Sequence, residues 1–397
     1  MFSGLFKRPA QIVAGTMGTR VGARCATCHD SWARATSSSP PSSSSRTPTR
    51  SSLGRRVSEN ATRLIGKEGT RRLHSSKLLR GRGGQTYQAG SRGVQEIIDN
   101  RKERFVLLPD EVETMMEAGD FRTKTELLAE LTRHTGDLSL PPISNFRVSS
   151  AALGASGRVY IGVNIEFESL PLPCSLHAEQ FLIMNALQHR ETSILNLCIS
   201  HVPCGHCRQF MCELHKSEEM KIQILGMEDQ TFTLPQLLPM RFTPKDLIGE
   251  DATFLFQKTR NGLAWTPDAA RAVAESGSSD PDLETLATLA LAEANASYAP
   301  YSKCPSGLAI LDAEGNCFSG GLIESAAYNP SVSPLHSALV NALISGMGGG
   351  WDQIRRVILV EPANAPVKHE HVLRETLKFI CPRADYAALY CEPIESS

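Results

Sequence analysis

The sequence has no apolar run approaching the 18 or more residues that a membrane-spanning helix requires, so we expect no membrane partner. It also lacks the dense, paired cysteines of a small disulfide scaffold, because its 11 cysteines are odd in number and scattered over 397 residues. We therefore expect reduced thiols. The hydrophobic content of 41% is normal for a globular chain, and the length leaves room for two domains of ordinary size.

Acidic residues are nearly missing from the first 84 positions, which hold 16 Lys and Arg against only Asp30, Glu59 and Glu68. The segment is also rich in Ser, and this composition is typical of organellar transit peptides. We expect residues 1–84 to be a disordered basic leader that directs the protein to the mitochondrion, with a plastid or cytoplasmic location as the alternative. A merely disordered extension or a mistaken upstream start codon would also explain the composition.

Positive charge is scarce in the rest of the chain. Removing the first 84 residues leaves 25 basic and 39 acidic residues, a formal balance of −14. Proteins that bind long nucleic acids usually carry a basic patch or stripe. We expect a small-molecule substrate and no nucleic acid partner, although a local basic groove would be compatible with this charge.

From about residue 105, helical patterns alternate with short apolar strands, which predicts an α/β sandwich built on one sheet. The expected elements are a helix through Leu127, Leu128 and Leu131 that Pro141 and Pro142 end, a strand at Val159–Val163, a helix from about His177, a strand at Ile194–Ile199, a helix from Cys204 and a strand at Lys221–Leu225. The same order returns after residue 281, behind a Ser- and Gly-rich stretch that is typical of a linker.

This return predicts duplication of a whole domain. Leu335-His336-Ser337-Ala338 aligns with Leu176-His177-Ala178-Glu179, and Pro362-Ala363-Asn364-Ala365-Pro366 aligns with Pro203-Cys204-Gly205-His206-Cys207. In this alignment the second copy has Ala338, Ala363 and Pro366 in place of an acid and two thiols. We predict a catalytic zinc domain at 105–256, a linker at 257–280 and a degenerate domain without zinc ligands at 281–397.

His177, Cys204 and Cys207 supply the three protein ligands that a catalytic zinc ion takes while its fourth position is kept for water. A Cys-x-x-Cys pair at a helix start lies on the first turn, where the positive end of the helix favours thiolates. Glu179 is two residues past His177 and can reach the same space, because side chains lean towards the helix N-terminus. It can move a proton between an activated water and a leaving amine. His-x-Glu with Pro-Cys-x-x-Cys is a known signature of zinc deaminases.

A closed structural zinc site is the alternative for these residues, and it would need a fourth protein ligand. The nearby candidates are Cys174, Cys212, His201 and His206. For each of them we favour the simpler interpretation as a packed thiol or a solvated imidazole.

Together these residues resemble the cytidine deaminase family, in particular its two-domain homodimeric type with an intact and a degenerate copy. The likeness covers roughly 105–395 and is most specific at Ser144–Phe146, Asn164–Phe167, His177–Gln180 and Pro203–Phe210. It implies a duplicated three-layer α/β/α sandwich, with a mixed sheet and helices on both faces. It also implies Zn²⁺ on His177, Cys204 and Cys207, and a homodimer.

The resemblance further implies roles for single residues. Glu179 is the acid and base, the amide of Ala178 lies near the pyrimidine carbonyl, and Asn164 and Glu166 hold the ribose 3′-hydroxyl. Phe146 packs on the base, and Tyr328 stands where the family places a Phe on a loop that reaches the partner subunit's site. The implied reaction converts cytidine and deoxycytidine to uridine and deoxyuridine plus ammonia, as in pyrimidine salvage.

Other functions share part of this pattern. A transfer-RNA adenosine deaminase or a polynucleotide cytosine deaminase has the same metal motif, and against it stand Asn164, Glu166, the acidic body and the degenerate second copy. A nucleotide deaminase would need a basic cluster for phosphate, and none stands out beside the motifs. A zinc module without catalysis is the third class.

Overall fold

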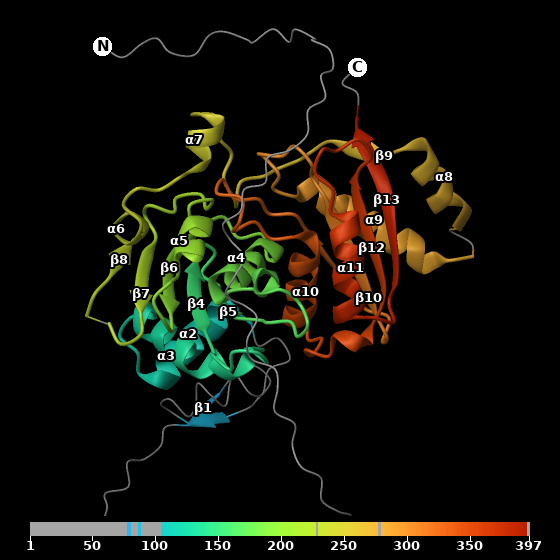
Figure 1. Cartoon of the computed structure of the whole chain (residues 1–397). Coiled ribbons are helices and arrows are strands. Elements are labelled where there is room, and N and C mark those ends of the chain that lie inside the picture. Colours follow the sequence, from blue (N-terminus) through green and yellow to red (C-terminus); the bar gives the residue numbers. More distant parts are fainter. Residues whose placement is uncertain (1–77, 81–85, 89–104, 228, 277–278, 395–397) are drawn as a thin grey trace, which may run out of the picture. The chain divides into compact units, whose positions relative to one another are not determined.

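The computed structural model describes residues 78–80, 86–88, 105–227, 229–276 and 279–394. The predicted leader lies outside the described residues except for strand β1 (Leu78–Arg80), which pairs antiparallel with β2 (Thr86–Gln88). From residue 105 onward the chain forms two α/β copies with a similar order of elements (Figure 1). The helices of the described part include none that is both long and apolar enough to cross a membrane.

The first copy is a six-stranded sheet in the order β3-β5-β4-β6-β7-β8. Its strands are β3 (Val106–Leu107), β4 (Ser149–Gly154), β5 (Val159–Val163), β6 (Ile194–Ile199), β7 (Lys221–Ile224) and β8 (Phe232–Thr233). Strands β6 and β7 are parallel and the other neighbours are antiparallel, so the sheet is mixed. The strands that we predict at 159–163 and 194–199 are confirmed with these bounds.

Successive side chains of each strand point to opposite faces of this sheet, and helices cover both faces. Ala151 and Val159 point into a core with helices α2 (Pro109–Gly119) and α3 (Lys124–His134). Their neighbours Ala152 and Tyr160 point into the opposite core. There they meet α4 (Ala178–Gln188) and α5 (Gly205–Met211). Two short helices, α6 (Leu234–Leu237) and α7 (Pro244–Ile248), follow at the end of the copy.

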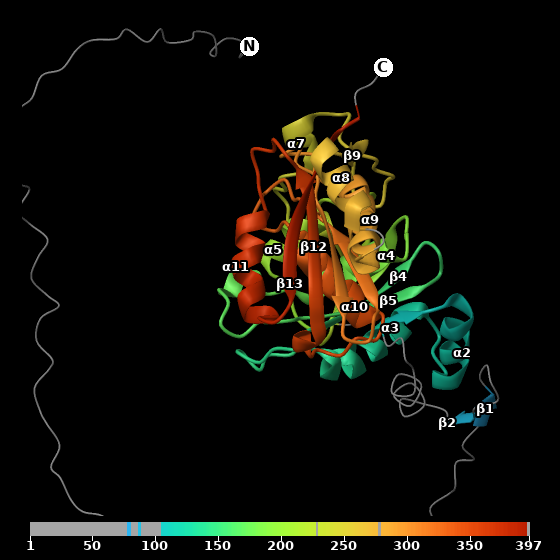
Figure 2. The same cartoon turned by 90° about the vertical axis from the view of Figure 1, so that its right-hand side faces the viewer.

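The second copy repeats this three-layer plan with a five-stranded mixed sheet in the order β11-β10-β12-β13-β9. Its elements are β9 (Leu263–Trp265), α8 (Pro267–Ser276), α9 (Pro281–Ala296), β10 (Gly307–Asp312), β11 (Cys317–Gly321), α10 (Pro334–Ile344), β12 (Ile354–Pro362), α11 (Glu370–Ile380) and β13 (Asp385–Pro393). Ala309 and Leu311 face α9, whereas Leu308 and Ile310 face α10 and α11. Figure 2 shows the sheet between α9 on one side and α11 on the other.

The two copies meet through their inner helices. Helices α4 and α10 contact each other between the two sheets (Figure 1), and their buried side chains belong to one continuous hydrophobic core. The start of α4 is also pressed against β5, because a Cβ at Gly162 would lie 2.2 Å from the carbonyl oxygen of Ala178. A glycine is required at this position, and the close approach fixes where α4 begins.

The predicted linker at 257–280 contains regular structure. Strand β9 pairs antiparallel with β13, and α8 packs on α9, so both elements are part of the second copy. The linker prediction therefore does not hold for residues 263–276. Three strand residues between Gly262 and Pro267 are too few to show an alternation in sequence, and their pairing partner β13 is the last strand of the chain.

The inner helices show that the two copies align in a different register from the one that we predict. Helices α4 and α10 both have 11 residues, and their N-caps are His177 and Ser333. The ends agree as well, since the first residue past α4 bonds back to Asn185 and the first past α10 bonds back to Asn341. Ser333 is therefore the counterpart of His177, and His336 lies three positions further along its helix.

The metal-motif helices give the same correction. Helix α5 begins after the N-cap Cys204, and its counterpart α11 begins after the N-cap His369, so Ala363 is not the equivalent of Cys204. His336 and Ala363 are as far apart in the sequence as His177 and Cys204 because two differences offset each other. His336 lies three positions past the counterpart of His177, whereas the segment between α10 and β12 is longer than that between α4 and β6. Spacing alone cannot detect paired changes of this kind.

Candidate metal centre and active site

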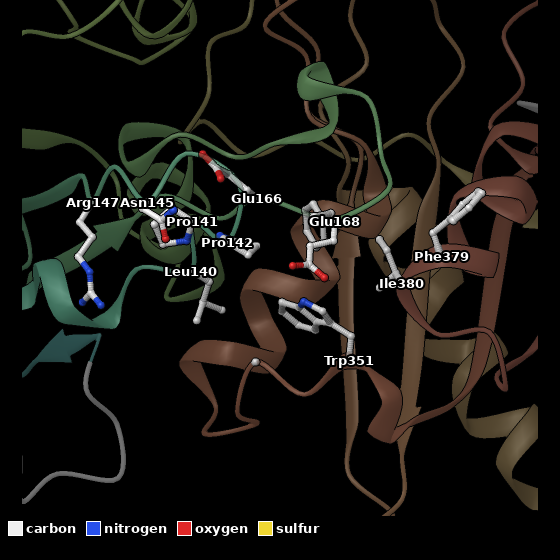
Figure 3. Close-up of a pocket in the computed structure, with 12 residues that line it drawn as sticks. Leu140, Pro141, Pro142, Asn145, Arg147, Glu166, Glu168, Trp351, Phe379 and Ile380 are labelled. Carbon is white, nitrogen blue, oxygen red and sulfur yellow. The ribbon is translucent and has the colours of Figure 1, made fainter. Parts of the chain in front are cut away.

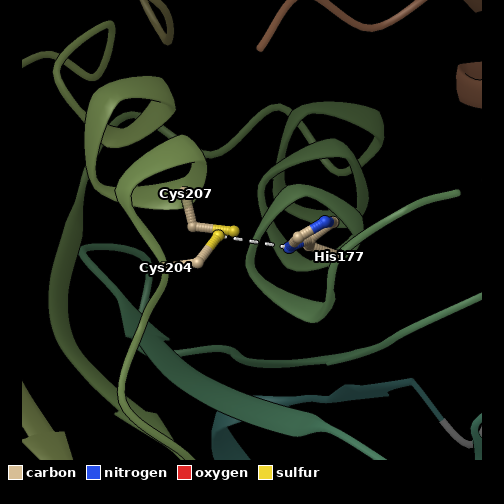
Figure 4. Close-up of side chains that lie close together, drawn as sticks. All are labelled: His177, Cys204 and Cys207. Atoms are coloured by element: carbon tan, nitrogen blue, oxygen red, sulfur yellow. Dashed lines mark hydrogen bonds between the residues drawn. The ribbon is translucent and has the colours of Figure 1, made fainter. Parts of the chain in front are cut away.

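Two helix starts in the first copy bring the predicted metal ligands together. His177 is the N-cap of α4, Cys204 is the N-cap of α5, and Cys207 lies in the first turn of α5 (Figure 4). One ligand atom from each of the three residues lies within 4.8 Å of the other two. Because both helices begin at this point, the positive ends of two helix dipoles face the sulfurs.

The charges of the three groups suit a divalent cation. A hydrogen bond from the Cys207 thiol lowers the pKa of Cys204 to about 3, whereas the pKa of Cys207 is raised by sharing that proton and by burial. The Nδ1 atom of His177 lies 3.5 Å from the Cys204 sulfur, and this hydrogen bond raises the pKa of the imidazole. A metal ion would replace the protons that now hold these three groups together.

The four candidates for a fourth ligand do not join the group. Among the described residues the metal-type cluster consists of His177, Cys204 and Cys207 alone. The His206 ring stacks on His177 with centroids 5.2 Å apart, the Cys212 thiol donates to the carbonyl of Arg208, and the His201 ring packs on Phe146. Three ligands from the chain leave one position of a tetrahedral ion open, as catalytic sites do.

Glu179 lies in the first turn of α4 and is only 4% exposed. Burial raises the pKa of its carboxyl, against the opposing effects of a hydrogen bond from Cys207 and of the charge on His177. The carboxylate therefore faces two of the three metal-type residues in a dry environment. A carboxyl with a raised pKa is suited to accept a proton and give it back.

Gln180 and His206 also contribute to the site, and we assign neither of them a role from the sequence. The Gln180 carbonyl oxygen accepts from the backbone N–H of His177 at 3.2 Å, and its amide lies 3.1 Å from His206 Nε2. The same amide donates to the carbonyl of Pro330, in the second copy, at 3.0 Å. Its place three residues after the N-cap is the sequence signal for such a bond, because a Gln there often bonds back to the N-cap.

The predicted ribose-binding residues hold a loop ahead of β4. Glu166 accepts hydrogen bonds from the backbone N–H groups of Ile143 and Ser144, both at 2.9 Å, and from the Ser144 hydroxyl at 2.6 Å. Asn164 accepts from the Val148 N–H and donates to the Phe146 carbonyl. These donors lower the pKa of Glu166 although burial acts to raise it. The loop that carries Phe146 is thus fixed by the two residues predicted to read the ribose.

The remaining predicted contacts differ in exposure. Ala178 is fully buried as the first residue of α4. Phe146 is 53% exposed and Tyr328 is 66% exposed, with Tyr328 at a φ of 60° in a turn of the second copy. The loop of Tyr328 reaches the first copy of its own chain, because its Pro330 carbonyl accepts the Gln180 amide.

A cavity of about 790 Å³ adjoins the ribose loop on the side of the second copy (Figure 3). Asn145 and Glu166 line it from the first copy, and Trp351 and Phe379 line it from the second. The metal-type residues lie outside its lining. The cavity is therefore a neighbour of the ribose loop, separate from the metal centre.

Comparison with known proteins identifies this pattern. Residues 122–222 and 234–374 each match a family model described as the cytidine and deoxycytidylate deaminase zinc-binding region. Cytidine deaminase 1 of Arabidopsis thaliana is 39% identical over 277 residues, which are 67% of this chain and 91% of that protein. Cytidine deaminase 6 of the same plant is 38% identical over 274 residues, or 66% and 91% of the two chains.

A solved cytidine deaminase from Mycobacterium tuberculosis aligns with 28% identity over 30% of this chain and 98% of its own, with a TM-score of 0.28. The first family match contains His177, Cys204 and Cys207, so zinc is the metal that this donor set takes. The second match covers residues 234–374, where the described residues contain no metal-type cluster, so it reflects similarity of sequence. The chain belongs to the cytidine deaminase family.

Proposed function

We propose that the chain catalyses the hydrolytic deamination of cytidine and deoxycytidine, which consumes one water and yields uridine or deoxyuridine plus ammonia. The observation that carries this proposal is the buried Glu179 carboxyl beside an open set of one imidazole and two thiols. Relatives at 38–39% identity are named cytidine deaminases, which supports the same reaction here.

Zinc, when bound by His177, Cys204 and Cys207, supplies Lewis-acid activation of water at neutral pH. Glu179 would then move both protons of the attacking water: the first goes to a ring nitrogen of the pyrimidine, and the second, from the new hydroxyl on the ring carbon, goes to the exocyclic nitrogen, which leaves as ammonia while the carbonyl forms. Its buried position raises the pKa of the carboxyl, so the proton is held long enough to be passed on. No other carboxylate is needed for this shuttle.

Backbone and loop groups of the first copy would orient the nucleoside. The first N–H groups of a helix have no partner within it, so the Ala178 N–H at the start of α4 is suited to the pyrimidine carbonyl. Glu166 already accepts three hydrogen bonds, and a carboxylate offers about four acceptor sites. One site remains for the ribose 3′-hydroxyl, with Asn164 beside it.

We also propose that the enzyme is a homodimer. Phe146 and Tyr328 are large aromatic side chains with more than half of their surface exposed, and both belong to loops assigned to base binding. A second copy of the chain would cover them and complete the pocket. Measurement of the mass in solution by light scattering tests this, and a monomer with full activity would overturn it.

Residues 1–84 are proposed to direct the protein to an organelle, the mitochondrion in preference to a plastid or the cytoplasm. The support is compositional: 16 basic residues against three acidic ones. A fluorescent protein fused to the C-terminal end of these residues should be imported into the organelle. The chain without these residues should stay in the cytosol. The implied role in the cell is pyrimidine salvage.

The proposed reaction is tested by the fall in ultraviolet absorbance when cytidine is converted to uridine, with ammonia measured in parallel. The same assay is run on cytidine monophosphate and on a single-stranded oligonucleotide that contains cytosine. Turnover of the free nucleosides alone supports the proposal. Comparable turnover of the oligonucleotide would assign the chain to polynucleotide deaminases, and zinc binding without ammonia release would leave a zinc module without catalysis.

A further inference from the structure

Glu213 is a charged residue with no place in the proposed reaction, yet it has 0% of its surface exposed. It follows directly on helix α5, whose C-cap is Cys212. Its backbone N–H bonds to the carbonyl of Phe210, so it continues the last turn of that helix. Burial of a carboxylate is costly unless its oxygens are satisfied, so its partners explain why it is there.

All of the partners of its side chain come from the second copy. One carboxylate oxygen accepts from the Tyr301 hydroxyl at 2.5 Å and lies 3.1 Å from the Tyr298 hydroxyl. The other oxygen accepts from the backbone N–H of Ala326 at 2.7 Å. Tyr298 bonds in addition to the carbonyl of Thr253, so its single proton is shared between two acceptors.

The loop that carries Tyr301 is the second copy's version of the ribose loop. Glu324 accepts from the N–H groups of Tyr301 and Ser302, as Glu166 accepts from those of Ile143 and Ser144. The scaffold of a nucleoside-binding loop is thus retained in a copy with no metal ligands among its described residues. In this chain the retained loop binds the Glu213 side chain of the first copy.

The hydrogen bonds to Glu213 matter for the metal centre because α5 is short. The helix has 7 residues, and a helix of this length is not stable by itself, so its position depends on what holds it. Cys207 and Glu213 are separated by about 9 Å along the helix at 1.5 Å per residue. A shift of Glu213 would therefore move both thiols relative to His177.

A second link joins the copies at the other metal-bearing helix. Gln180 bonds to the His177 N–H with its oxygen and to the Pro330 carbonyl with its amide. The second copy thus contacts α4, which follows His177, near the start of that helix. It contacts α5, which carries the thiols, at the end of that helix. Within the first copy, the Glu213 carbonyl accepts from the Leu255 N–H, so the bonds to the Glu213 side chain add to a backbone contact.

We propose that the second copy sets the geometry of the zinc ligands, and that Glu213 is a positioning residue held by Tyr298, Tyr301 and Ala326. This rests on the zinc site proposed above. The second copy, which has no metal-type cluster among its described residues, thereby controls how tightly the first copy keeps its metal. Groups that orient metal ligands from outside typically alter metal affinity about 10- to 100-fold when removed.

The test is the rate at which zinc is released from the full chain to a chromogenic chelator. Tyr298→Phe, Tyr301→Phe and the double variant each keep the ring and remove only a hydroxyl. Tyr160→Phe is the matched control, because its hydroxyl also donates to a buried carboxylate, that of Glu191, at 2.9 Å, but within the first copy and away from α5. All proteins are compared at one temperature, below the lowest melting midpoint of the set.

The double variant should release zinc about tenfold faster than the wild type, and Tyr160→Phe should release it at the wild-type rate despite a similar fall in melting temperature. If the double variant and the control release zinc equally, the hydroxyls serve only stability and the inference is overturned. Chelator release does not depend on turnover, so an inactive wild type that holds zinc would refute the proposed reaction and leave this inference standing.

Discussion

Ser333 begins helix α10 at the position where His177 begins helix α4, so a hydroxyl stands in the second copy in place of the first metal ligand. Its hydroxyl accepts the backbone N–H of His336 as an ordinary helix cap. Two residues further on, Leu335 takes the place of Glu179 and is fully buried. The second copy has thus exchanged a ligand and a proton carrier for a cap and a core residue.

Zinc content is the first prediction, because the described residues contain one metal-type cluster, that of His177, Cys204 and Cys207. Purified protein should contain one zinc per chain. His336→Gln should keep that zinc, since the His336 ring bonds to the Cys174 carbonyl and Ser333 and takes no part in the cluster. Cys204→Ala should lose it. Metal analysis by atomic emission measures all three, and two zinc ions per chain would contradict the assignment.

Replacement of Glu179 by Gln is the second prediction. The amide has the shape of the carboxyl and leaves the three ligands untouched, but it cannot take and return a proton. Turnover should fall about 100-fold or more while zinc content stays at the wild-type level. Glu168→Gln is the control, because that carboxylate is exposed and lies at the cavity beside the ribose loop. Equal turnover of the Glu179 variant and the wild type would rule out the proton shuttle.

The first copy could be predicted from sequence to a fair depth, and the reason lies in particular residues. The strand at 159–163 is short, apolar and bounded by turn residues, and His177 and Cys204 mark helix starts because both are N-caps. The second copy was harder to predict from sequence. We aligned His336 with His177 because both are histidines, whereas the structural counterpart of His177 is Ser333, three residues earlier.

Long-range relations account for what sequence could not supply. Glu213 looks like any acid after a helix, and its three donors lie 85 to 113 residues away in the other copy. Strand β9 has only three residues and pairs with the last strand of the chain. Such contacts are fixed by how the copies pack, and no local pattern records them.

Glu166→Gln is the third prediction. The carboxylate accepts three donors from the ribose loop, and an amide in its place would turn an N–H group towards one of them. The loop with Phe146 should loosen, so KM for cytidine should rise about tenfold while kcat changes less. Steady-state kinetics of the variant separate the two constants. A fall in kcat with an unchanged KM would place Glu166 at the chemical step and refute the binding role.

The fourth prediction concerns pH and His336, whose pKa is lowered by burial, although its hydrogen bond to the Cys174 carbonyl acts to raise it. Above pH 6.5 the ring is neutral in both the folded and the unfolded chain, and it adds no pH dependence. Below pH 6.5 the unfolded chain binds a proton at this residue, whereas the folded chain does not until its own lower pKa is reached. As the pH is lowered below 6.5, the free energy of unfolding should therefore decrease, by at most about 1.4 kcal/mol per pH unit for this single proton.

His336→Gln isolates this contribution, because the amide can still donate to the Cys174 carbonyl but cannot take up a proton in this range. The wild type should be the more stable protein at pH 7.5, and its advantage over the variant should shrink at pH 5.5. Urea unfolding at the two pH values, with zinc in excess, gives both differences, and the pH dependence of zinc binding cancels between wild type and variant. An advantage that stays the same at both pH values would show that burial does not keep His336 neutral in the folded chain.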